Sequence, residues 1–104
     1  MTGNWQVYII LCSDDSFYTG ITTNMERRFR EHAEGRGARY FRGRRPLRVV
    51  YLETGHCHSS AARREVLIKS MSRADKALLV LDDLDPMHDS LRLPADRQGQ
   101  FPSP

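Results

Sequence analysis

Tyr8, Tyr18, Arg28, His32 and Glu65 are the residues of this 104-residue chain whose types and spacing could carry chemistry. Phenol and imidazole groups transfer protons, a guanidinium offers phosphate a planar fork of donors, and a carboxylate accepts protons or cations. Arg28 and His32 are four residues apart and therefore fall on one side of a helix. Whether the five side chains meet depends on the elements that carry them.

The charged members of this group also have a purely structural interpretation. A helix rich in both charges is typical of a protein surface laced with ion pairs. Arg28 has only Glu31, shared with Arg27, as an acidic neighbour at helical spacing, so we expect it to be the arginine least committed to local pairing. Glu65 stands four residues before Lys69, the spacing of a helical ion pair, but its place at the edge of an apolar stripe would also let it point inward.

The two tyrosines lie on segments rich in β-branched and aromatic residues, and the CSDDS sequence between them has turn chemistry, so we predict a hairpin. An odd-numbered loop, such as Asp14-Asp15-Ser16, pairs Tyr8 with Thr22 and puts both phenols on one face, whereas a two-residue loop separates them. Gly20 lies on the same face as the phenols, and its missing side chain leaves a gap that a phosphate or a helix could approach.

The rest of the chain carries further helix and strand signals. Thr23 and Glu26 form a capping-box pattern, so a helix should begin there and end at Gly35 or Gly37. The predicted elements are strands at 5–11, 17–22 and 48–54 and helices from Thr23, from Ser59 or Ser60 to Met71, and at 73–81. The second helix has an apolar stripe of Ala61, Leu67, Ile68 and Met71. The order β-β-α-β-α-α predicts an α+β fold, a small antiparallel three-stranded sheet flanked by helices.

The net charge of +3 understates how basic one part of the chain is. Residues 24–48 hold nine arginines and three glutamates. Because arginine suits phosphate, we expect nucleic acid as the partner, with a solvated basic surface as the alternative. Between Gly35 and Pro46, arginines alternate with Tyr40 and Phe41, which predicts a mobile basic loop whose rings could stack on exposed bases.

Length and composition set further limits. We predict one domain at 1–82 and, at 83–104, an acidic, proline-containing tail that is disordered. The opposed charges suggest that this tail shields the arginine-rich loop until substrate arrives. Cys12 and Cys57 make no disulfide framework, and the HCH triplet at 56–58 lacks the ligand spacing of a zinc site. Without a secretion signal or a long apolar run, we expect a cytoplasmic protein that does not enter a membrane.

Taken together, the motifs resemble the GIY-YIG nuclease superfamily, in particular its small stand-alone bacterial members, most of which are described as endonucleases. VYI at 7–9 and YTG at 18–20 correspond to the two name-giving motifs, the NMERRFREH helix follows, and ARREVLIK carries Glu65. The resemblance covers residues 5–81. Thr19 replaces the central isoleucine of the second motif, which removes no reactive group.

The resemblance implies a metal-dependent endonuclease that hydrolyses phosphodiester bonds in DNA, or in RNA, with low sequence specificity. Its catalytic residues would be Tyr8, Tyr18, Arg28, His32 and Glu65. Glu65 would hold a single Mg²⁺ or Mn²⁺ ion, and Arg28 would bind the scissile phosphate. Tyr8 either takes a proton from the attacking water or only orients it while His32 assists the transfer. Tyr18 would position the other groups.

A nucleic-acid-binding surface is expected around this centre. Its predicted members are Gly20, Arg27, Arg36, Arg39, Tyr40, Arg42, Arg44, Arg45, Arg63 and Lys69. The alternative function is a catalytically silent nucleic-acid-binding module that acts with a partner protein. Binding alone would not require a carboxylate beside the phosphate site, so Glu65 favours the enzyme.

Overall fold

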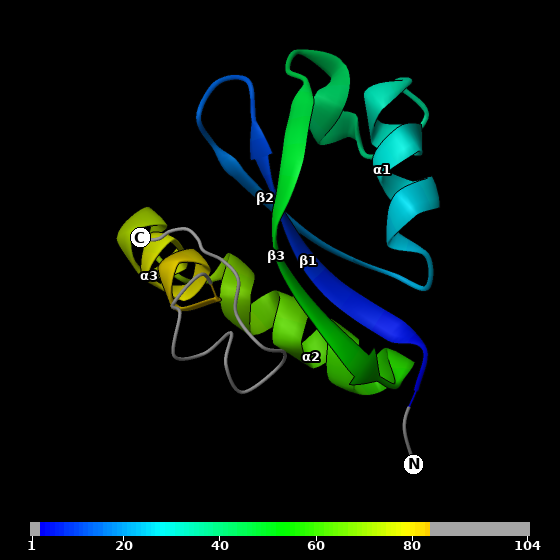
Figure 1. Cartoon of the computed structure of the whole chain (residues 1–104), viewed down its shortest axis with the longest axis vertical. Helices are drawn as coiled ribbons and strands as arrows, with labels where there is room; N and C mark the ends of the chain where they lie inside the picture. Colours follow the sequence, from blue (N-terminus) through cyan, green and yellow to red (C-terminus); the bar gives the residue numbers. More distant parts are fainter. Residues whose placement is uncertain (1–2, 84–104) are drawn as a thin grey trace, which may run out of the picture. The chain divides into compact units, whose positions relative to one another are not determined.

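The structure, a computed structural model, describes residues 3–83. Its strands are β1 (Trp5–Cys12), β2 (Phe17–Thr22) and β3 (Pro46–His56), and its helices are α1 (Met25–Ala33), the 3₁₀ helix η1 (Arg39–Arg42), α2 (His58–Lys69) and α3 (Arg73–Asp83) (Figure 1). This order confirms the predicted α+β fold, with η1 as an addition. The chain divides into two compact units between Met71 and Ser72, so α3 belongs to a different unit from the sheet.

The predicted tail at 83–104 lies outside the described residues, except for residue 83, which ends α3. Its disorder and its shielding role stay predictions. None of the helices in residues 3–83 is long and apolar enough to cross a membrane.

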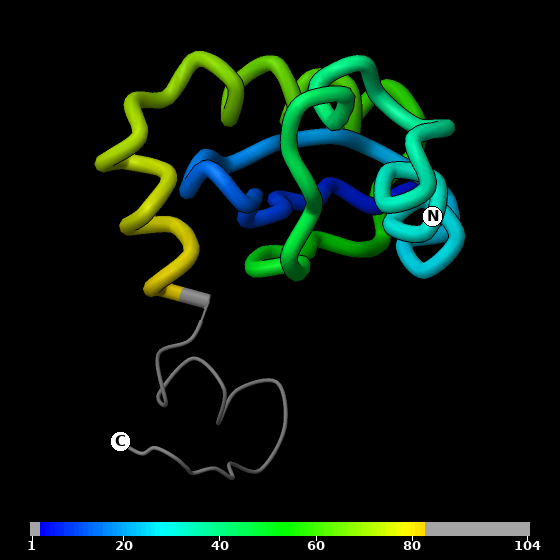
Figure 2. The backbone as a smooth tube through the Cα atoms, turned by 90° about the horizontal axis from the view of Figure 1, so that it is seen from above, coloured from blue at the N-terminus to red at the C-terminus, as the bar shows by residue number. Residues whose placement is uncertain are grey.

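The sheet has the strand order β2-β1-β3, with antiparallel pairing throughout (Figure 2). β1 is its central strand and is buried on both faces. Val7 and Ile9 point to one face, while Tyr8 and Ile10 point to the other, and all four are at most 1% exposed. The central strand therefore carries Tyr8 into the interior of the fold.

The hairpin register puts both phenols on one face, as the odd-numbered loop predicts. The predicted pairing of Tyr8 with Thr22 is wrong by two residues: Tyr8 lies opposite Gly20 and Tyr18 lies opposite Ile10. The hairpin loop lies one residue earlier than that pairing requires, at 13–15, because the Cys12 amide donates to the Ser16 carbonyl, and the residue before Ser16 has a left-handed backbone. A shift of two residues preserves the face on which each side chain lies.

α1 begins one residue later than the capping-box pattern suggests. Asn24, not Thr23, is the N-cap, and its side chain accepts a hydrogen bond from the Arg27 amide at 3.0 Å. The helix ends at Ala33, just before Gly35, which adopts a φ of +80°. Because glycine tolerates this left-handed backbone best, Gly35 is the residue that stops the helix.

The face of the sheet that carries the phenols is covered by α1 and η1. The buried cluster on this side consists of Tyr8, Ile10, Cys12 and Phe41, packed against Tyr18, Met25, Phe29, Ala38, Tyr40, Val49 and Leu52. Phe41, at 6% exposed, belongs to this core. The prediction of a mobile loop between α1 and β3 is therefore wrong, because the loop folds into η1 to bury its aromatic side chain.

Hydrogen bonds tie η1 to the β1–β2 turn. The Tyr40 hydroxyl donates to Ser16 Oγ at 2.7 Å, and Ser16 Oγ donates to Asp14 Oδ1 at 2.6 Å. Arg44 Nε donates to Asp14 Oδ2 at 2.7 Å, and the Arg44 guanidinium stacks on the Tyr40 ring at 3.9 Å. The segment after α1 is thus fixed at both of its aromatic residues.

α2 contacts all three strands and covers the face that carries Val7 and Ile9. Ala61 and Ile68 are fully buried, but Leu67, predicted in the same stripe, is 52% exposed, so the predicted stripe is wrong at this residue. The N-cap is Cys57, not Ser59 or Ser60. At the same end of the helix, the rings of Trp5 and His58 meet edge to face at 4.7 Å between centroids.

Candidate active site

The centre of the candidate site is a contact between Tyr8 and His32. The Tyr8 hydroxyl oxygen lies 2.8 Å from His32 Nε2, and both side chains are 1% exposed. Other rings enclose them: the His32 centroid is 5.4 Å from that of Tyr18 and 4.5 Å from that of Phe41. Two reactive groups from β1 and α1 therefore meet in an apolar surrounding, away from bulk water.

Gly20 shapes this centre from the neighbouring strand. A Cβ atom at this position would lie 2.4 Å from the Tyr8 hydroxyl oxygen and 2.6 Å from Tyr8 Cζ. The prediction of an open gap beside Gly20 is wrong, because the phenol of Tyr8 occupies that space. Gly20 therefore lets the phenol lie flat across β2.

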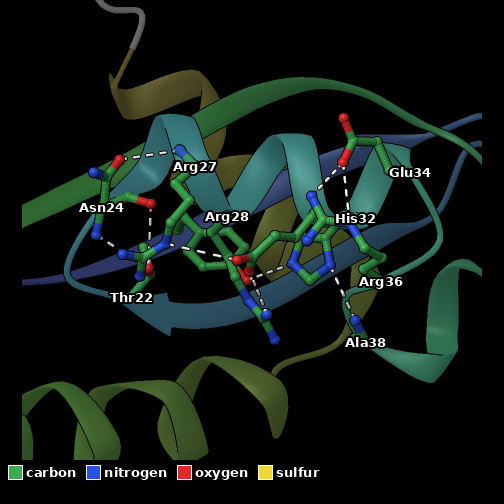
Figure 3. Close-up of polar contacts among 10 residues, drawn as sticks. Thr22, Asn24, Arg27, Arg28, His32, Glu34, Arg36 and Ala38 are labelled. Atoms are coloured by element: carbon green, nitrogen blue, oxygen red, sulfur yellow. Dashed lines mark hydrogen bonds and ion pairs between the residues drawn. The ribbon is translucent and has the colours of Figure 1, made fainter.

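Arg28 lies on the same side of α1 as His32 (Figure 3). Its Nη1 donates to Glu31 Oε1 at 2.9 Å, whereas Arg27 Nε lies 3.7 Å from the other Glu31 oxygen. The expectation that Arg28 is the least paired arginine of this helix is wrong, because the Glu31 carboxylate lies closer to Arg28 than to Arg27. The pair with Glu31 raises the pKa of Arg28, and hydrogen bonding to Tyr8 raises it further.

Glu65 reaches the site from α2. Its carboxylate pairs with Lys69 Nζ at 3.2 Å, the helical ion pair that its spacing indicates. Lys69 Nζ in turn lies 5.9 Å from the centre of the Tyr18 ring. The charge of Glu65 also acts on both phenols, since it raises the pKa of Tyr8 and of Tyr18. Glu65 therefore makes its local ion pair with Lys69 while its charge still acts on both phenols.

Burial dominates the protonation of the three central groups. It raises the pKa of Tyr8 well above its usual value, and Tyr18 adds to that rise while Arg28 opposes it. Burial also raises the pKa of Tyr18, against Lys69 and Arg28. For His32, burial and the charge of Arg28 lower the pKa to about 4. At neutral pH the free protein thus holds two neutral phenols and a neutral imidazole beside one guanidinium.

The residues predicted to bind nucleic acid fall into two groups. Arg36 is paired with Glu34, Arg27 with Glu31 and Arg44 with Asp14. Within this predicted set, the exposed arginines with no ion pair among residues 3–83 are Arg39, Arg42, Arg45 and Arg63. Tyr40 is half-buried between Tyr18 and Arg44, and burial of Phe41 means that the predicted stacking of Phe41 on bases is wrong.

Sequence reasoning missed two residues of the site, Gly37 and Ala38. The Ala38 amide donates to His32 Nδ1 at 3.1 Å, and a Cβ at Gly37 would lie 2.1 Å from the same nitrogen. From the sequence, Gly37 is predicted only as a possible end of the first helix. The one sequence signal for the contact between Ala38 and His32 is Gly37, a glycine close in sequence to a candidate histidine, because a glycine can mark a close approach of the backbone.

A second polar cluster joins β3 to α2 and accounts for His56. Glu53 accepts hydrogen bonds from Tyr51 at 2.5 Å and from Arg64 at 2.7 Å, and His56 Nε2 lies 2.8 Å from its other oxygen. His56 Nδ1 lies 2.8 Å from Ser60 Oγ. The cluster has no group in common with the Tyr8 site. Its contacts with Tyr51 and His56 lie within β3, and those of Arg64 and Ser60 join β3 to α2.

The donor set suits a hydrated divalent ion bound by one carboxylate. Among residues 3–83, no three His, Cys, Asp or Glu side chains gather as a protein-only metal cage would require. Mg²⁺ commonly takes one or two carboxylates and fills its remaining positions with water and substrate phosphate. Glu65, which is half-buried, is a carboxylate that could hold such an ion.

The chain is similar to one domain family and to a group of small proteins of that size. Residues 4–77 match the GIY-YIG catalytic domain. A UPF0213 protein of Natronomonas pharaonis is 48% identical over 83 residues, which cover 80% of this chain and 98% of that relative. A UPF0213 protein of Desulfotalea psychrophila is 51% identical over 77 residues, covering 73% and 70%. The solution structure of a UPF0213 protein of Bacillus halodurans, 39% identical, aligns with a TM-score of 0.53 over 90% of this chain and all of that one.

Proposed function

The chain belongs to the GIY-YIG catalytic domain family, a family of nucleases, and from this membership we propose that it is a metal-dependent endonuclease that hydrolyses phosphodiester bonds in DNA. One observation carries the proposal. Around Tyr8, His32 contacts the phenol hydroxyl, the Tyr18 ring centroid lies 6.2 Å from that of Tyr8, and the charges of Arg28 and Glu65 both act on the Tyr8 pKa. A carboxylate, a guanidinium and a buried phenol are the groups that this reaction needs in one place.

Arg28 is the group that binds the scissile phosphate. Its pair with Glu31 uses Nη1, and the fork of the guanidinium leaves further N–H groups for phosphate oxygens. Because the charge of the phosphate oxygens grows during attack, a guanidinium held in place by a neighbouring carboxylate stabilises the transition state more than the ground state.

Tyr8 acts on the attacking water. In the free protein its pKa is high, so the phenol is neutral, and the nearby Arg28 is the residue that favours the phenolate. To act as a base the phenol first releases its own proton to solvent, and the phenolate then takes a proton from the attacking water, so that hydroxide attacks phosphorus. Tyr18 packs against His32 and keeps the imidazole in place.

Glu65 would hold one Mg²⁺ or Mn²⁺ ion, which when bound polarises the phosphate and neutralises charge on its oxygens. Lys69 stays beside Glu65 and competes electrostatically with the ion for the carboxylate.

The exposed, unpaired arginines of η1 and the following residues hold the nucleic-acid backbone. Log affinity falls linearly with log salt, and each phosphate contact makes that slope steeper by about 0.9. The double variant Arg39→Gln, Arg42→Gln should therefore reduce that slope by between about 1 and 2. Arg36→Gln is the matched control, and we expect a smaller change because Arg36 is already paired with Glu34.

A nicking assay tests the catalytic proposal. Supercoiled plasmid, branched DNA and a matched RNA are incubated with the protein and Mg²⁺ or Mn²⁺. Glu65→Gln keeps the shape of the side chain but loses its charge, and should lower cleavage by at least about 100-fold without lowering DNA affinity. Glu26→Gln, on the exposed part of α1, is the matched control and should cleave like the wild type.

Two outcomes would oppose the proposal. Equal cleavage by the wild type and Glu65→Gln would assign the activity to a contaminant. Salt-dependent binding without cleavage, under every metal condition, would favour a nucleic-acid-binding module that depends on a partner protein for chemistry.

A further inference from the structure

His32 is held at both of its ring nitrogens. The Tyr8 hydroxyl oxygen lies 2.8 Å from Nε2, and the Ala38 amide nitrogen lies 3.1 Å from Nδ1 (Figure 3). A backbone N–H is a donor at every pH, so Nδ1 must accept with its lone pair and cannot carry a proton. In a neutral imidazole the proton is then on Nε2, which faces Tyr8.

The turn after α1 is shaped to make this contact. Gly35 reverses the chain with its φ of +80°, and Gly37 passes so close to the ring that a Cβ atom would lie 2.1 Å from Nδ1. Ala38 then has φ −63° and ψ 145° at the start of η1, with its N–H directed at the imidazole. Burial of Phe41 in the core anchors η1 and with it the amide of Ala38.

The charged and titratable groups around His32 agree with a neutral ring. Arg28 and Glu31 face it from α1, Tyr8 from β1 and Tyr18 from β2. Burial is the largest influence that keeps the pKa of His32 low, Arg28 adds to it, and Glu31 opposes it. A protonated ring would also turn an N–H toward the Ala38 N–H, which would place two donors against each other.

We propose that the Gly37–Ala38 backbone fixes His32 as the tautomer protonated on Nε2, and that His32 is a positioning residue that donates a hydrogen bond to Tyr8 and carries no proton in the reaction. This inference rests on the proposed nuclease function. The sequence leaves open whether Tyr8 takes the proton of the attacking water or only orients that water while His32 assists the transfer, and this inference decides for the first.

The proton balance of the hydrolysis follows from this arrangement. Nε2–H occupies the Tyr8 oxygen from the side of the imidazole, so the Tyr8 hydroxyl proton points elsewhere. The same donor stabilises the phenolate form. The neutral phenol first releases its own proton to solvent. The phenolate then takes a proton from water: a new O–H bond forms on Tyr8, one O–H bond of water breaks, and the hydroxide attacks phosphorus. The P–O bond to the leaving oxygen breaks, and that oxygen takes up a proton from solvent. The imidazole begins and ends neutral.

The tautomer can be measured directly, without any activity. In the full-length protein labelled with ¹⁵N histidine, the two ring nitrogens of His32 give different chemical shifts according to which one carries the proton. We expect one tautomer, protonated on Nε2, from pH 8 down to about pH 5, because the pKa is depressed. A proton on Nδ1, or an even mixture of tautomers, in the wild type would overturn the proposal.

Ala38→Pro removes the single donor to Nδ1. The φ of Ala38 matches that of proline, and Gly37 before it accepts the extended backbone that proline demands. We expect the Nδ1-protonated form to appear and the pKa of His32 to rise. Ala38→Ser keeps the N–H and should retain the wild-type spectrum. An unchanged tautomer in folded Ala38→Pro would show that the turn does not fix the ring.

His32→Gln separates a donor from a proton carrier. An amide can donate to Tyr8 but cannot take up a proton at this pH. We expect His32→Gln to keep kcat within about tenfold of the wild type, while His32→Ala loses about 100-fold. Equal, severe loss in both variants would overturn the donor role. If the wild type cleaves no nucleic acid, the nuclease proposal fails, and the ring spectra still decide the tautomer.

Discussion

Replacing Gly20 with alanine tests how closely Tyr8 lies against β2. The new Cβ would be 2.4 Å from the Tyr8 hydroxyl oxygen, so the phenol would have to move by about 1 Å to restore ordinary contact. It has little room, since it is 1% exposed and hydrogen-bonded to His32.

The cost follows from two effects. Overpacking a filled site destabilises by about 1–3 kcal/mol, and weakening the Tyr8–His32 hydrogen bond adds about 1 kcal/mol. Alanine returns roughly 0.5–1 kcal/mol through its stiffer unfolded chain. We therefore expect the free energy of unfolding in urea to fall by about 2 kcal/mol. A displacement of 1 Å in the group that acts on water should also lower kcat for nicking by about 100-fold.

Gly43→Ala is the control. No described atom lies within 4 Å of a Cβ at Gly43, and its φ of −115° suits any residue. This variant should be as stable as the wild type or slightly more so, with unchanged kcat. If Gly20→Ala matched Gly43→Ala in both measurements, Tyr8 would not lie across Gly20, and the geometry of the site would be wrong.

Three further predictions concern the stability of the core. Thr19 is 2% exposed and its hydroxyl has no hydrogen-bond partner among the described residues, so Thr19→Val should raise the free energy of unfolding in urea by about 1 kcal/mol. Phe41→Ala should lower it by about 3 kcal/mol, whereas Leu47→Ala, at a residue 51% exposed, should lower it by less than about 1 kcal/mol. The pKa of His32 is lowered from its usual value of 6.5 to about 4 in the native state, so between these pH values the unfolded state binds a proton that the native state does not. The free energy of unfolding is therefore largest above pH 6.5 and falls by about 3 kcal/mol as the pH decreases to about 4. Urea titrations at pH 7 and pH 4 should show this decrease in the wild type and a smaller one in His32→Gln.

Each of these expectations has an opposite result that would count against it. A destabilised Thr19→Val would mean that the buried hydroxyl has a partner. A stable Phe41→Ala would return η1 to the mobile loop of the sequence prediction. Parallel pH curves for the wild type and His32→Gln would mean that His32 titrates normally.

Local sequence signals were sufficient for the order of the main strands and helices, but most of the predicted element boundaries differ from the observed ones by one or two residues. The central strand β1 was recognisable because its apolar run is buried on both faces, and α1 because its amphipathic pattern is closed by Gly35. The face shared by Tyr8 and Tyr18 followed from the parity of the hairpin loop alone. The resemblance to GIY-YIG nucleases, confirmed by the family match, supplied the grouping of the five candidate residues, which no local pattern contains.

Two of the failures depended on contacts between residues distant in the sequence, and the third depended on side-chain geometry within α1. Phe41 sits in a glycine- and arginine-rich segment, and only its burial beside Tyr18 and His32 makes that segment a 3₁₀ helix. The space beside Gly20 is filled by a side chain from the neighbouring strand. The choice of Glu31 between two arginines depends on side-chain geometry that helical spacing does not determine. Tertiary packing decided the first two.

The placement of Trp5 gives the protein an internal optical reporter. It is the single tryptophan of the chain, and it touches His58 at the start of α2, on the opposite face of the sheet from the phenols. Its fluorescence will therefore follow the docking of α2 onto the strands. Because no residue of the Tyr8 centre adjoins the indole, a polynucleotide bound there leaves the emission nearly constant, so unfolding can be recorded in the presence of substrate.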